Sequence, residues 1–455
     1  MIVRNKNFLV IGVAKSGIAV TKYLLSKGAH VVLTDIMSKE KISTEVGQLL
    51  KHPNLKGIFG EQPPQSLLVS INYIITSPGV PMDIPILERA RKENIEILNE
   101  IELSYRLISS WTIAITGTNG KTTTTSLVGE IVKASKRETF VVGNIGTPMI
   151  SFIDKATQNS CFVVEISSFQ LEGIQQFHPK ISAILNITPD HLNRHKTMEN
   201  YIFTKSKVFS NQVEGDITIL NADNVNTFSL VNRTKGRVVL FSRSLSLDEG
   251  VCIKSNEIVV KDQGKTIPIC PISEIKMPGS HNLENVLAAV AITYYANIPV
   301  EVIRSVLKKF KGVEHRIELV ETIKGIDFIN DSKGTNPEAT IKAIEAMSKP
   351  IILIAGGMDK GTDFTELISF FQGKVKHLVL LGETSDQIEH IARKQGYNNI
   401  IKVSSMESAV TKSYEIANED DVILLSPACA SWDMFSSFEE RGNLFKEIVR
   451  SLKGV

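Results

Sequence analysis

Short apolar runs recur along the whole chain and alternate with amphipathic stretches. The first run, Phe8–Ile11, is followed by a small turn, a helical stretch over Ile18–Lys27 and a second run, Val31–Asp35. Runs of this kind are typical of strands that are buried in a parallel sheet. Their alternation with helical patterns predicts an α/β fold.

Three such series predict three domains, at 1–98, 99–312 and 313–455. A length of 455 residues agrees with this number, since a domain takes roughly 150 residues. We expect the first and third domains to be Rossmann-like and the central one to be a doubly wound sheet of the P-loop ATPase type. The central domain also has short strand candidates that predict an antiparallel flank, namely Asp216–Leu220, Arg237–Phe241, Ile258–Val260 and Ile267–Ile269.

The segment Trp111–Glu130 reads WTIAITGTNGKTTTTSLVGE and predicts a strand, a glycine loop and a helix that begins at Lys121. Unpaired N–H groups of the loop and of the first helical turn can point at one anion. Lys121 would place a charge on the outer phosphates, and the Thr122 hydroxyl would reach Mg²⁺. Ile115 stands where G-x-x-x-x-G-K-[ST] has its first glycine, yet we favour phosphate binding over an ordinary strand-to-helix turn.

The first domain opens like a dinucleotide-binding unit, but its fingerprint is incomplete. Ala14 replaces the middle glycine of G-x-G-x-x-G and Lys15 follows it, which crowds the place where a pyrophosphate would meet the backbone. Asp35, at the end of the second strand, keeps contact with a nucleotide ribose possible. A nicotinamide-dependent oxidoreductase is therefore the weaker alternative, and a nucleotide that is not a dinucleotide is favoured.

Polar side chains follow the strands of the central domain. Asn144, Glu165 and His191 come at or just after three strand ends, which meet at one edge of a parallel sheet. Glu165 is the natural Mg²⁺ ligand because Mg²⁺ prefers carboxylate oxygen, although a helix cap or a surface acid is the alternative. A lone histidine such as His191 is more often structural.

Two further patterns leave their roles open. Lys205 and Lys207 lie on an expected helix, Asn200–Phe209, and we expect both on its solvated face. His281 and Asn282 precede a helix expected over Leu283–Ala296, where Asn282 could cap the helix or both could face a base.

Composition excludes several classes of function. Lys and Arg number 51 against 49 Asp and Glu, a net charge of +2, so no global field recruits nucleic acid or an anionic membrane. Neither a signal peptide nor a membrane-spanning run is present, and we expect a cytoplasmic protein. The four cysteines form no C-x-x-C pair, so neither a disulfide framework nor a zinc site is expected.

Taken together, the motifs resemble the Mur ligase family over essentially the whole chain. The first four motifs below also occur in the related folate-polyglutamate ligases, whereas the last two point to the D-glutamate-adding branch of the Mur family. The motifs are GTNGKTT at Gly117–Thr123, EISSFQLE at Glu165–Glu172, DHL at Asp190–Leu192, GSHNLEN at Gly279–Asn285, His315-Arg316, NDSKGTN at Asn330–Asn336 and SPACASWDMF at Ser426–Phe435.

The resemblance implies an ATP- and Mg²⁺-dependent ligase of peptidoglycan synthesis. Its small-molecule substrates would be UDP-N-acetylmuramoyl-L-alanine and D-glutamate, joined through an acyl phosphate. We expect a monomer that neither binds nucleic acid nor inserts into a membrane. The alternatives are another Mur-type or folylpolyglutamate-type ligase, and a non-catalytic nucleotide-binding regulatory protein.

The resemblance also assigns roles to individual residues. Lys121, His191 and Lys205 would be catalytic, and Lys205 falls where the family carries a carbamylated lysine. The metal ligands would be Thr122, Glu165, His191 and carbamylated Lys205. The nucleotide would contact Gly117, Thr118, Asn119, Gly120, Lys121, Thr122, Thr123, His281, Asn282, Asn285, Arg316, Asp331 and Lys333. The acceptor would contact Ser16, Asp35, Gly79, Asn144 and His191, and D-glutamate would contact Thr335, Lys360, Ser431 and Phe438.

Overall fold

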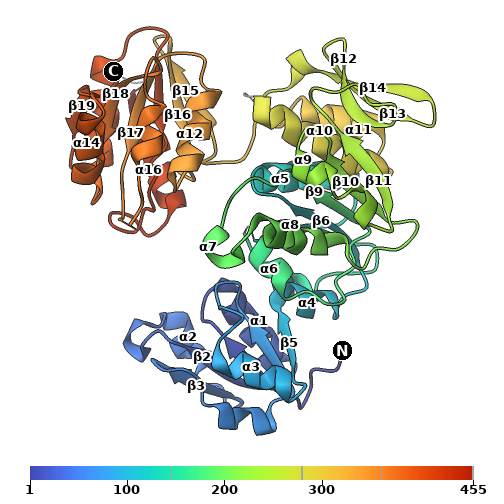
Figure 1. Cartoon of the computed structure of the whole chain (residues 1–455). Coiled ribbons are helices and arrows are strands. Elements are labelled where there is room, and N and C mark those ends of the chain that lie inside the picture. Colours follow the sequence, from blue (N-terminus) through green and yellow to red (C-terminus); the bar gives the residue numbers. More distant parts are fainter. Residues whose placement is uncertain (145, 278–279, 360, 453–455) are drawn as a thin grey trace. The chain divides into compact units, whose positions relative to one another are not determined.

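The computed structural model describes residues 1–144, 146–277, 280–359 and 361–452, with the backbone alone at 280 and 281. Its described strands form three sheets, and helices lie against each sheet (Figure 1). The chain divides into two compact units, which are described separately. The first unit holds Met1–Ile275 and His281–Lys309, and the second holds Lys276–Ser280 and Phe310–Val455.

The first sheet has five parallel strands in the order β3-β2-β1-β4-β5. In the central strand β1, the residues Phe8–Ile11 are all apolar and buried. Phe8 and Val10 pack in the core on one face of the sheet, and Leu9 and Ile11 pack in the core on the other. Strand order reverses beside β1, so the loops after β1, β2 and β4 share the edge where ligands of such sheets bind. The elements are β1 Asn7–Ile11, α1 Lys15–Ser26, β2 His30–Asp35, α2 Thr44–Leu49, β3 Leu55–Phe59, β4 Tyr73–Thr76, α3 Pro85–Lys92 and β5 Glu96–Asn99.

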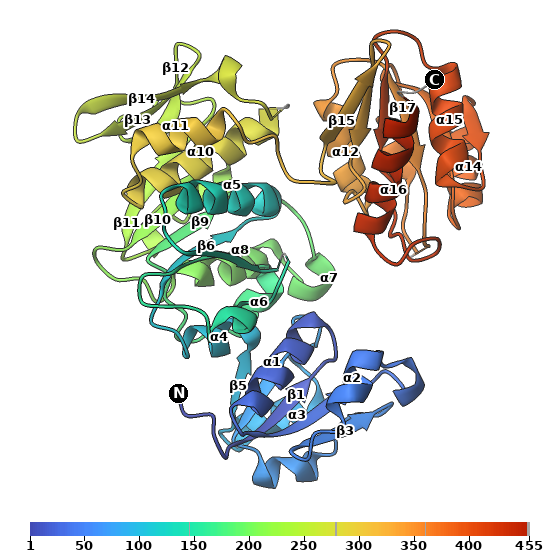
Figure 2. The same ribbon diagram turned by 180° about the vertical axis from the view of Figure 1, so that it is seen from behind.

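The second sheet has nine strands in the order β14-β13-β12-β11-β10-β9-β6-β8-β7. Helices α5 and α11 cover one face, and α6 and α8 cover the other (Figure 2). The strands are β6 Trp111–Thr116, β7 Thr139–Gly143, β8 Cys161–Glu165, β9 Ile181–Ile184, β10 Ile217–Asn221, β11 Arg237–Phe241, β12 Gly250–Lys254, β13 Glu257–Asp262 and β14 Lys265–Pro271. The helices are α5 Lys121–Ala134, α6 Ser168–Glu172, α7 Leu192–His195, α8 Met198–Ser206, α9 Val225–Phe228, α10 Ser280–Tyr295 and α11 Val300–Leu307.

The antiparallel flank is confirmed in part. Strands β12, β13 and β14 pair antiparallel, whereas β10 and β11 extend the parallel region. The prediction that Asp216–Leu220 and Arg237–Phe241 belong to the flank was therefore wrong. Period and length identify a strand, but the direction of its partner depends on the connection between them.

The third sheet forms the second unit, with strand order β15-β16-β20-β17-β18-β19. Only its edge pair β15–β16 is antiparallel among the pairings of the described strands. The elements are β15 Glu318–Ile323, β16 Ile326–Asn330, α12 Pro337–Ala346, β17 Ile351–Ala355, α13 Thr365–Ser369, β18 Val375–Leu380, α14 Ser385–Lys394, β19 Ile400–Lys402, α15 Met406–Ile416, β20 Val422–Leu425 and α16 Phe438–Ser451.

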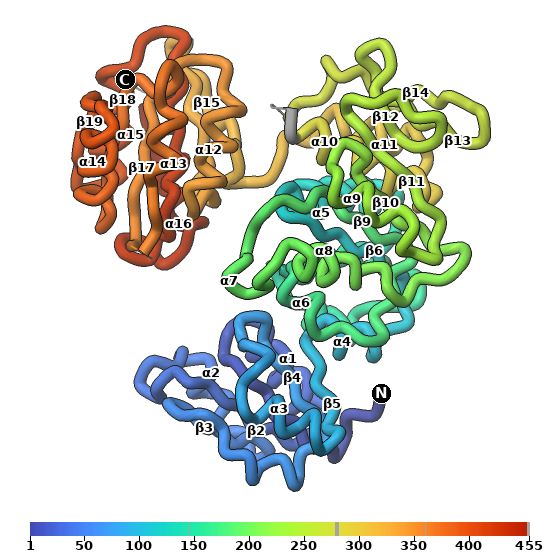
Figure 3. The backbone as a smooth tube through the Cα atoms, viewed as in Figure 1, coloured from blue at the N-terminus to red at the C-terminus, as the bar shows by residue number. Residues whose placement is uncertain are grey.

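A short helix, α4 (Glu100–Tyr105), follows β5 and leads into the second sheet (Figure 3). Asn99 caps it by accepting the Glu102 N–H at 2.9 Å, and also donates to the Gln170 carbonyl. The buried Glu102 carboxylate accepts three successive backbone N–H groups, of residues 175–177, at 2.8–3.0 Å, and the Arg106 guanidinium at 2.7 Å. Helix α4 is therefore bonded tightly to the segment that follows α6.

The three-part α/β architecture predicted from the sequence is confirmed. The exact domain limits at 98 and 312 stay a prediction. Within the described residues, every helix is too short or too polar to cross a membrane.

Candidate active site

The loop between β6 and α5 has the predicted strand, turn and helix. Gly120 has φ +82°, and a Cβ placed on it would lie 2.1 Å from Asn285 Oδ1, so both conformation and space require glycine there. The Lys121 ammonium donates to the carbonyls of Gly117 at 2.9 Å and Thr118 at 2.7 Å. Lys121 and the N-terminus of α5 thus lie together, as phosphate binding requires.

The loop is held in shape by the segment after β9. Thr118 N–H donates to the Asn186 carbonyl at 2.9 Å, and Asn119 N–H donates to Asn186 Oδ1 at 2.8 Å. The Thr118 hydroxyl lies 3.2 Å from both the Thr188 carbonyl and the Tyr201 hydroxyl. These bonds hold the loop without using the N–H groups of the first turn of α5. Those N–H groups are therefore available to a ligand. Asn186 and Thr188 were not predicted to have this role, because neither belongs to a motif.

Asn144 and Glu165 meet at the neighbouring strand ends. Asn144 Nδ2 donates to Glu165 Oε1 at 2.7 Å, and the Asn144 N–H donates to the Glu165 carbonyl at 2.8 Å. The Glu165 side chain is buried, and within the described part of the chain its Oε2 has no hydrogen-bond partner. A buried carboxylate oxygen without a donor fits a cation. The surface-acid alternative for Glu165 is therefore wrong.

His191 lies on the same side of the second sheet. It has a left-handed backbone, with φ +53°, and its ring packs on Phe169 with centroids 4.8 Å apart. Burial lowers the pKa of His191, and the positive charges of Lys121 and Lys205 lower it further, although Asp190 acts in the opposite direction. A neutral imidazole beside the side chains of Lys121 and Lys205 can act as a ligand or a hydrogen-bond partner.

Lys205 corrects the expectation of a solvated face. Its side chain is 1% exposed, and its Nζ donates at 2.8 Å to the carbonyl of Gly117, in the loop between β6 and α5. Burial lowers the pKa of Lys205 well below its usual value, and Lys121 lowers it further. Lys207 is half-buried and donates to the Glu172 carbonyl at 3.1 Å, so the expectation was wrong for both lysines.

Helix α10 places the side-chain amides of Asn282 and Asn285 near the start of α5. It begins at Ser280, so Asn282 lies inside the helix and the interpretation of Asn282 as its cap was wrong. Asn285 Nδ2 donates to Asn282 Oδ1 at 3.3 Å, and the Thr124 hydroxyl donates to Asn285 Oδ1 at 3.4 Å. The side chain of His281 lies outside the described residues.

The donor set suits a metal held partly by its substrate. Within 1–144, 146–277, 282–359 and 361–452, no three His, Cys, Asp or Glu side chains are placed so that they could hold a metal ion by themselves. One carboxylate, a threonine hydroxyl at Thr122 and substrate phosphates are an ordinary set for Mg²⁺, which keeps several waters. Glu165 is buried at the end of β8, and Thr122 is buried in the first turn of α5, directly after Lys121.

The predicted acceptor residues of the first sheet lie at the carboxyl ends of its strands, where sheets of this kind bind ligands. Asp35 accepts the N–H groups of Val13 and Met37, each at 2.9 Å, so this carboxylate fixes the loops after β1 and β2. Ser16 is half-buried in the first turn of α1, and Gly79 is exposed after β4.

In the second unit, Asp331 is buried at the end of β16. Its carboxylate accepts the Ser426 hydroxyl at 2.7 Å and the Ile317 N–H at 3.2 Å, and burial raises its pKa to about 6. The neighbouring Arg316 has a buried Nε without a partner among the described residues. Lys333 Nζ lies 5.5 Å from the Phe438 ring centroid, so these side chains share one end of the third sheet.

Arg441 is a residue of this site that the sequence analysis missed. Its guanidinium is 2% exposed and donates to Ser332 Oγ at 2.9 Å, the Ser332 carbonyl at 2.8 Å and the Cys429 carbonyl at 3.2 Å. It thereby joins two of the polar loops. Ser431 is buried on one of them, Thr335 follows the other, and Lys360 lies outside the described residues.

Comparisons with known proteins agree over the full length. Three family models match: "Mur ligase MurD-like, N-terminal domain" at 6–99, "Mur ligase middle domain" at 115–293 and "Mur ligase, glutamate ligase domain" at 315–429. The chain is 49% identical to the UDP-N-acetylmuramoylalanine--D-glutamate ligase of Alkaliphilus oremlandii and 47% identical to that of Clostridioides difficile. Both matches cover 100% of each chain.

Solved structures show the same fold at lower identity. The UDP-N-acetylmuramate-alanine ligase of Thermotoga maritima has a TM-score of 0.60 and 19% identity, with 98% of this chain and 99% of that chain covered. A pseudomurein peptide ligase of Methanothermus fervidus has a TM-score of 0.57 and 18% identity, with 98% and 100% covered. None of these similarities supports the oxidoreductase or the regulatory alternative.

Proposed function

This chain belongs to the Mur ligase family, and from that premise we propose that it joins D-glutamate to UDP-N-acetylmuramoyl-L-alanine, a reaction that converts ATP to ADP and phosphate. The full-length identity of 45–49% to relatives that carry this one name is the observation that carries the proposal. The product belongs to peptidoglycan synthesis. We further propose a cytoplasmic monomer that uses Mg²⁺.

The reaction needs two chemical steps. An oxygen of the L-alanyl carboxylate attacks the γ-phosphorus of ATP, which releases ADP and leaves an acyl phosphate. The D-glutamate amine then attacks the acyl carbon, and phosphate leaves with the former carboxylate oxygen. Phosphorylation is required because a free carboxylate is a poor acylating agent at neutral pH.

The chain's residues support the first step through charge and position. Lys121 and the N–H groups at the start of α5 would hold the β- and γ-phosphates, where negative charge shifts in the transition state. Mg²⁺, when bound, would neutralise phosphate charge and orient the attacked group, and Thr122, Glu165 and His191 would hold it. Asn144, already bonded to Glu165, would bring the acceptor carboxylate to the same place.

Lys205 is suited to form a carbamate. The unprotonated form of its amine, which burial favours, can attack CO₂, giving a carbamate and one released proton, and this converts a buried base into an anion. The new carboxylate would lie near Lys121, whose positive charge it would balance, and it would offer oxygen to a second Mg²⁺.

The amino acid would be held in the second unit by Thr335, Lys360, Ser431 and Phe438. Arg441 would support this site because its guanidinium donates hydrogen bonds to both the Ser332 loop and the Cys429 loop and so holds them together. Adenine would contact His281, Asn282 and Asn285, while Arg316, Asp331 and Lys333 would complete the nucleotide site.

One assay tests the proposal. ADP release is measured with UDP-N-acetylmuramoyl-L-alanine and a panel of amino acids that includes both glutamate enantiomers. We expect release that depends on the acceptor and on D-glutamate. Equal release with another amino acid would support a sibling ligase, and binding of ATP without turnover would support a regulatory role.

A further inference from the structure

Arg194 connects loops of the first and second sheets inside the first unit. It lies in α7, a single helical turn between His191 and Lys196, which both have a positive φ, at +53° and +71°. Such conformations are costly for residues with a Cβ, so side-chain contacts must hold this turn.

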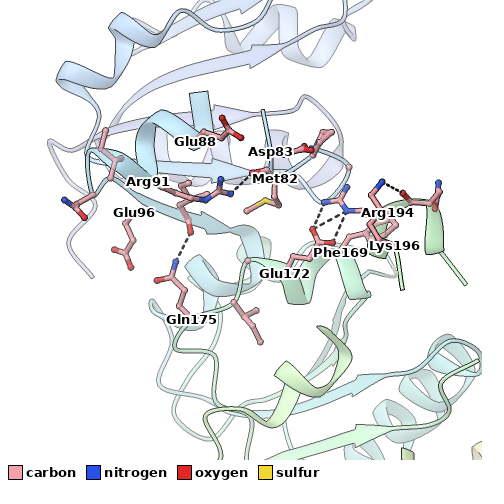
Figure 4. A pocket seen from close by; sticks show the side chains of 18 residues that line it. Met82, Asp83, Glu88, Arg91, Glu96, Phe169, Glu172, Gln175, Arg194 and Lys196 are labelled. Atoms are coloured by element: carbon pink, nitrogen blue, oxygen red, sulfur yellow. Dashed lines mark hydrogen bonds and ion pairs between the residues drawn. The ribbon is translucent and has the colours of Figure 1, made fainter. Parts of the chain in front are cut away.

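The Arg194 guanidinium forms an ion pair with Glu172, the last residue of α6. Its Nε donates to Glu172 Oε1 at 3.0 Å and its Nη2 to Glu172 Oε2 at 2.6 Å, which is a two-point ion pair. The two side chains are only 21% and 18% exposed, so water screens the pair weakly. Figure 4 shows this pair beside Phe169.

The guanidinium also reaches His191 through an aromatic ring. Arg194 Cζ lies 4.6 Å from the Phe169 ring centroid, and the Phe169 and His191 centroids are 4.8 Å apart. Phe169 therefore touches both Arg194 and the imidazole. A shift of the guanidinium would change the packing that orients His191.

The third contact crosses to the first sheet. Arg194 Nη2 donates to the Val80 carbonyl at 3.0 Å. Val80 belongs to the turn after β4, in which the Val80 N–H donates to the Ser77 carbonyl and Gly79 is exposed for the acceptor. Arg194 and this turn also line one cavity of about 1210 Å³ (Figure 4).

We propose that Arg194 is a positioning residue. It holds the turn after β4, which would bind the acceptor, at a fixed position relative to His191. The inference rests on the proposed function, since it concerns the acceptor of that reaction. Only a planar fork can bond Glu172 at two points and Val80 at once, because a lysine ammonium is a point charge on a flexible stem. Arginine, and not positive charge alone, is therefore required.

The test is Arg194→Lys in the full-length protein, with Arg237→Ala as the matched control. Arg237 also belongs to the first unit, pairs with Asp262 at 2.8 Å and packs on the Tyr295 ring at 5.0 Å. We expect Arg194→Lys to lower kcat/KM for UDP-N-acetylmuramoyl-L-alanine by about tenfold to a hundredfold. The KM for ATP and the melting temperature should stay close to those of the wild type, and Arg237→Ala should change kcat/KM less than twofold.

A double-mutant cycle with Glu172→Gln supplies the second measurement. If the two side chains act together, the double variant should lose less than the product of the two single losses. Wild-type kcat/KM in Arg194→Lys, or an equal loss of ATP affinity, would overturn the positioning role. Failure of the wild-type enzyme to use this acceptor would instead refute the proposed function, so the two failures are distinguishable.

Discussion

Gly120 allows a sharp test of the loop that is predicted to bind phosphate. A control glycine, Gly264, separates the cost of backbone strain from the cost of a steric clash. Gly120→Ala places a Cβ at φ +82° and 2.1 Å from Asn285 Oδ1. Gly264→Ala, in the turn between β13 and β14, places one at φ +74° with no atom within 4 Å. Both variants bear the left-handed strain, but only the first also displaces a neighbour.

The magnitudes follow from these contacts. A left-handed alanine costs about 1–2 kcal/mol, less about 0.4–1 kcal/mol regained because the unfolded chain is less free. Asn285 must withdraw by roughly 1 Å in Gly120→Ala, and overpacking of this kind costs about 1–3 kcal/mol more. We therefore expect Gly264→Ala to lose about 1 kcal/mol of unfolding free energy, and Gly120→Ala about 2–4 kcal/mol.

The functional readout is sharper than the thermal one. Asn285 lies at the predicted nucleotide site and accepts the Thr124 hydroxyl, so its displacement should raise the KM for ATP by about tenfold to a hundredfold. Gly264→Ala should leave that KM unchanged in the ADP-release assay. If the two variants melt alike and bind ATP alike, the loop is not constrained as described and the reasoning fails.

Three other predictions concern charged groups. Lys121→Ala should lower turnover by about a hundredfold to a thousandfold with the melting temperature retained, and near-normal ADP release would exclude a role on phosphate. Lys205→Ala should lose activity and regain part of it with added short carboxylates such as formate, whereas full activity without them would contradict a carbamate. Asp331→Asn should stabilise the second unit in chemical unfolding at pH 8, since the folded pKa of about 6 exceeds the unfolded 3.8. The native carboxyl contributes stability below pH 4 that is lost as the pH rises through 6, so the variant's advantage should grow to roughly 3 kcal/mol above pH 7, and a pH-independent difference would refute it.

The parallel strands and the glycine loop between β6 and α5 were predictable from local signals. Strand β6 and the start of α5 at Lys121 match the sequence prediction, since an apolar run, glycines and a helix start are all encoded within twenty residues. Strand β15 escaped prediction because it is an edge strand with Glu318 and Glu321 among its residues. Strand β12 was missed too, although Val251 and Cys252 are buried.

The environment of long side chains could not be predicted in the same way. Lys205 sits on an ordinary helical pattern, and it is buried only because α8 packs against the carbonyl of Gly117, 88 residues away in sequence. Arg441 follows two glutamates at the start of α16, which is typical of a solvated helix, yet it bonds a loop 109 residues away. Partners at such distances are set by the fold, and no local period carries them.

The carboxylate of Glu102 has a consequence for anyone who divides the protein into fragments. A cut made after residue 99, one residue beyond the end of the first predicted domain, would give α4 to the downstream piece and leave its Asn99 cap on the other. Stopping the upstream piece after residue 106 would instead strip three amide hydrogens at residues 175–177 of their shared acceptor. Neither fragment should express as a well-behaved protein, whereas a fragment of residues 1–309 keeps this junction whole.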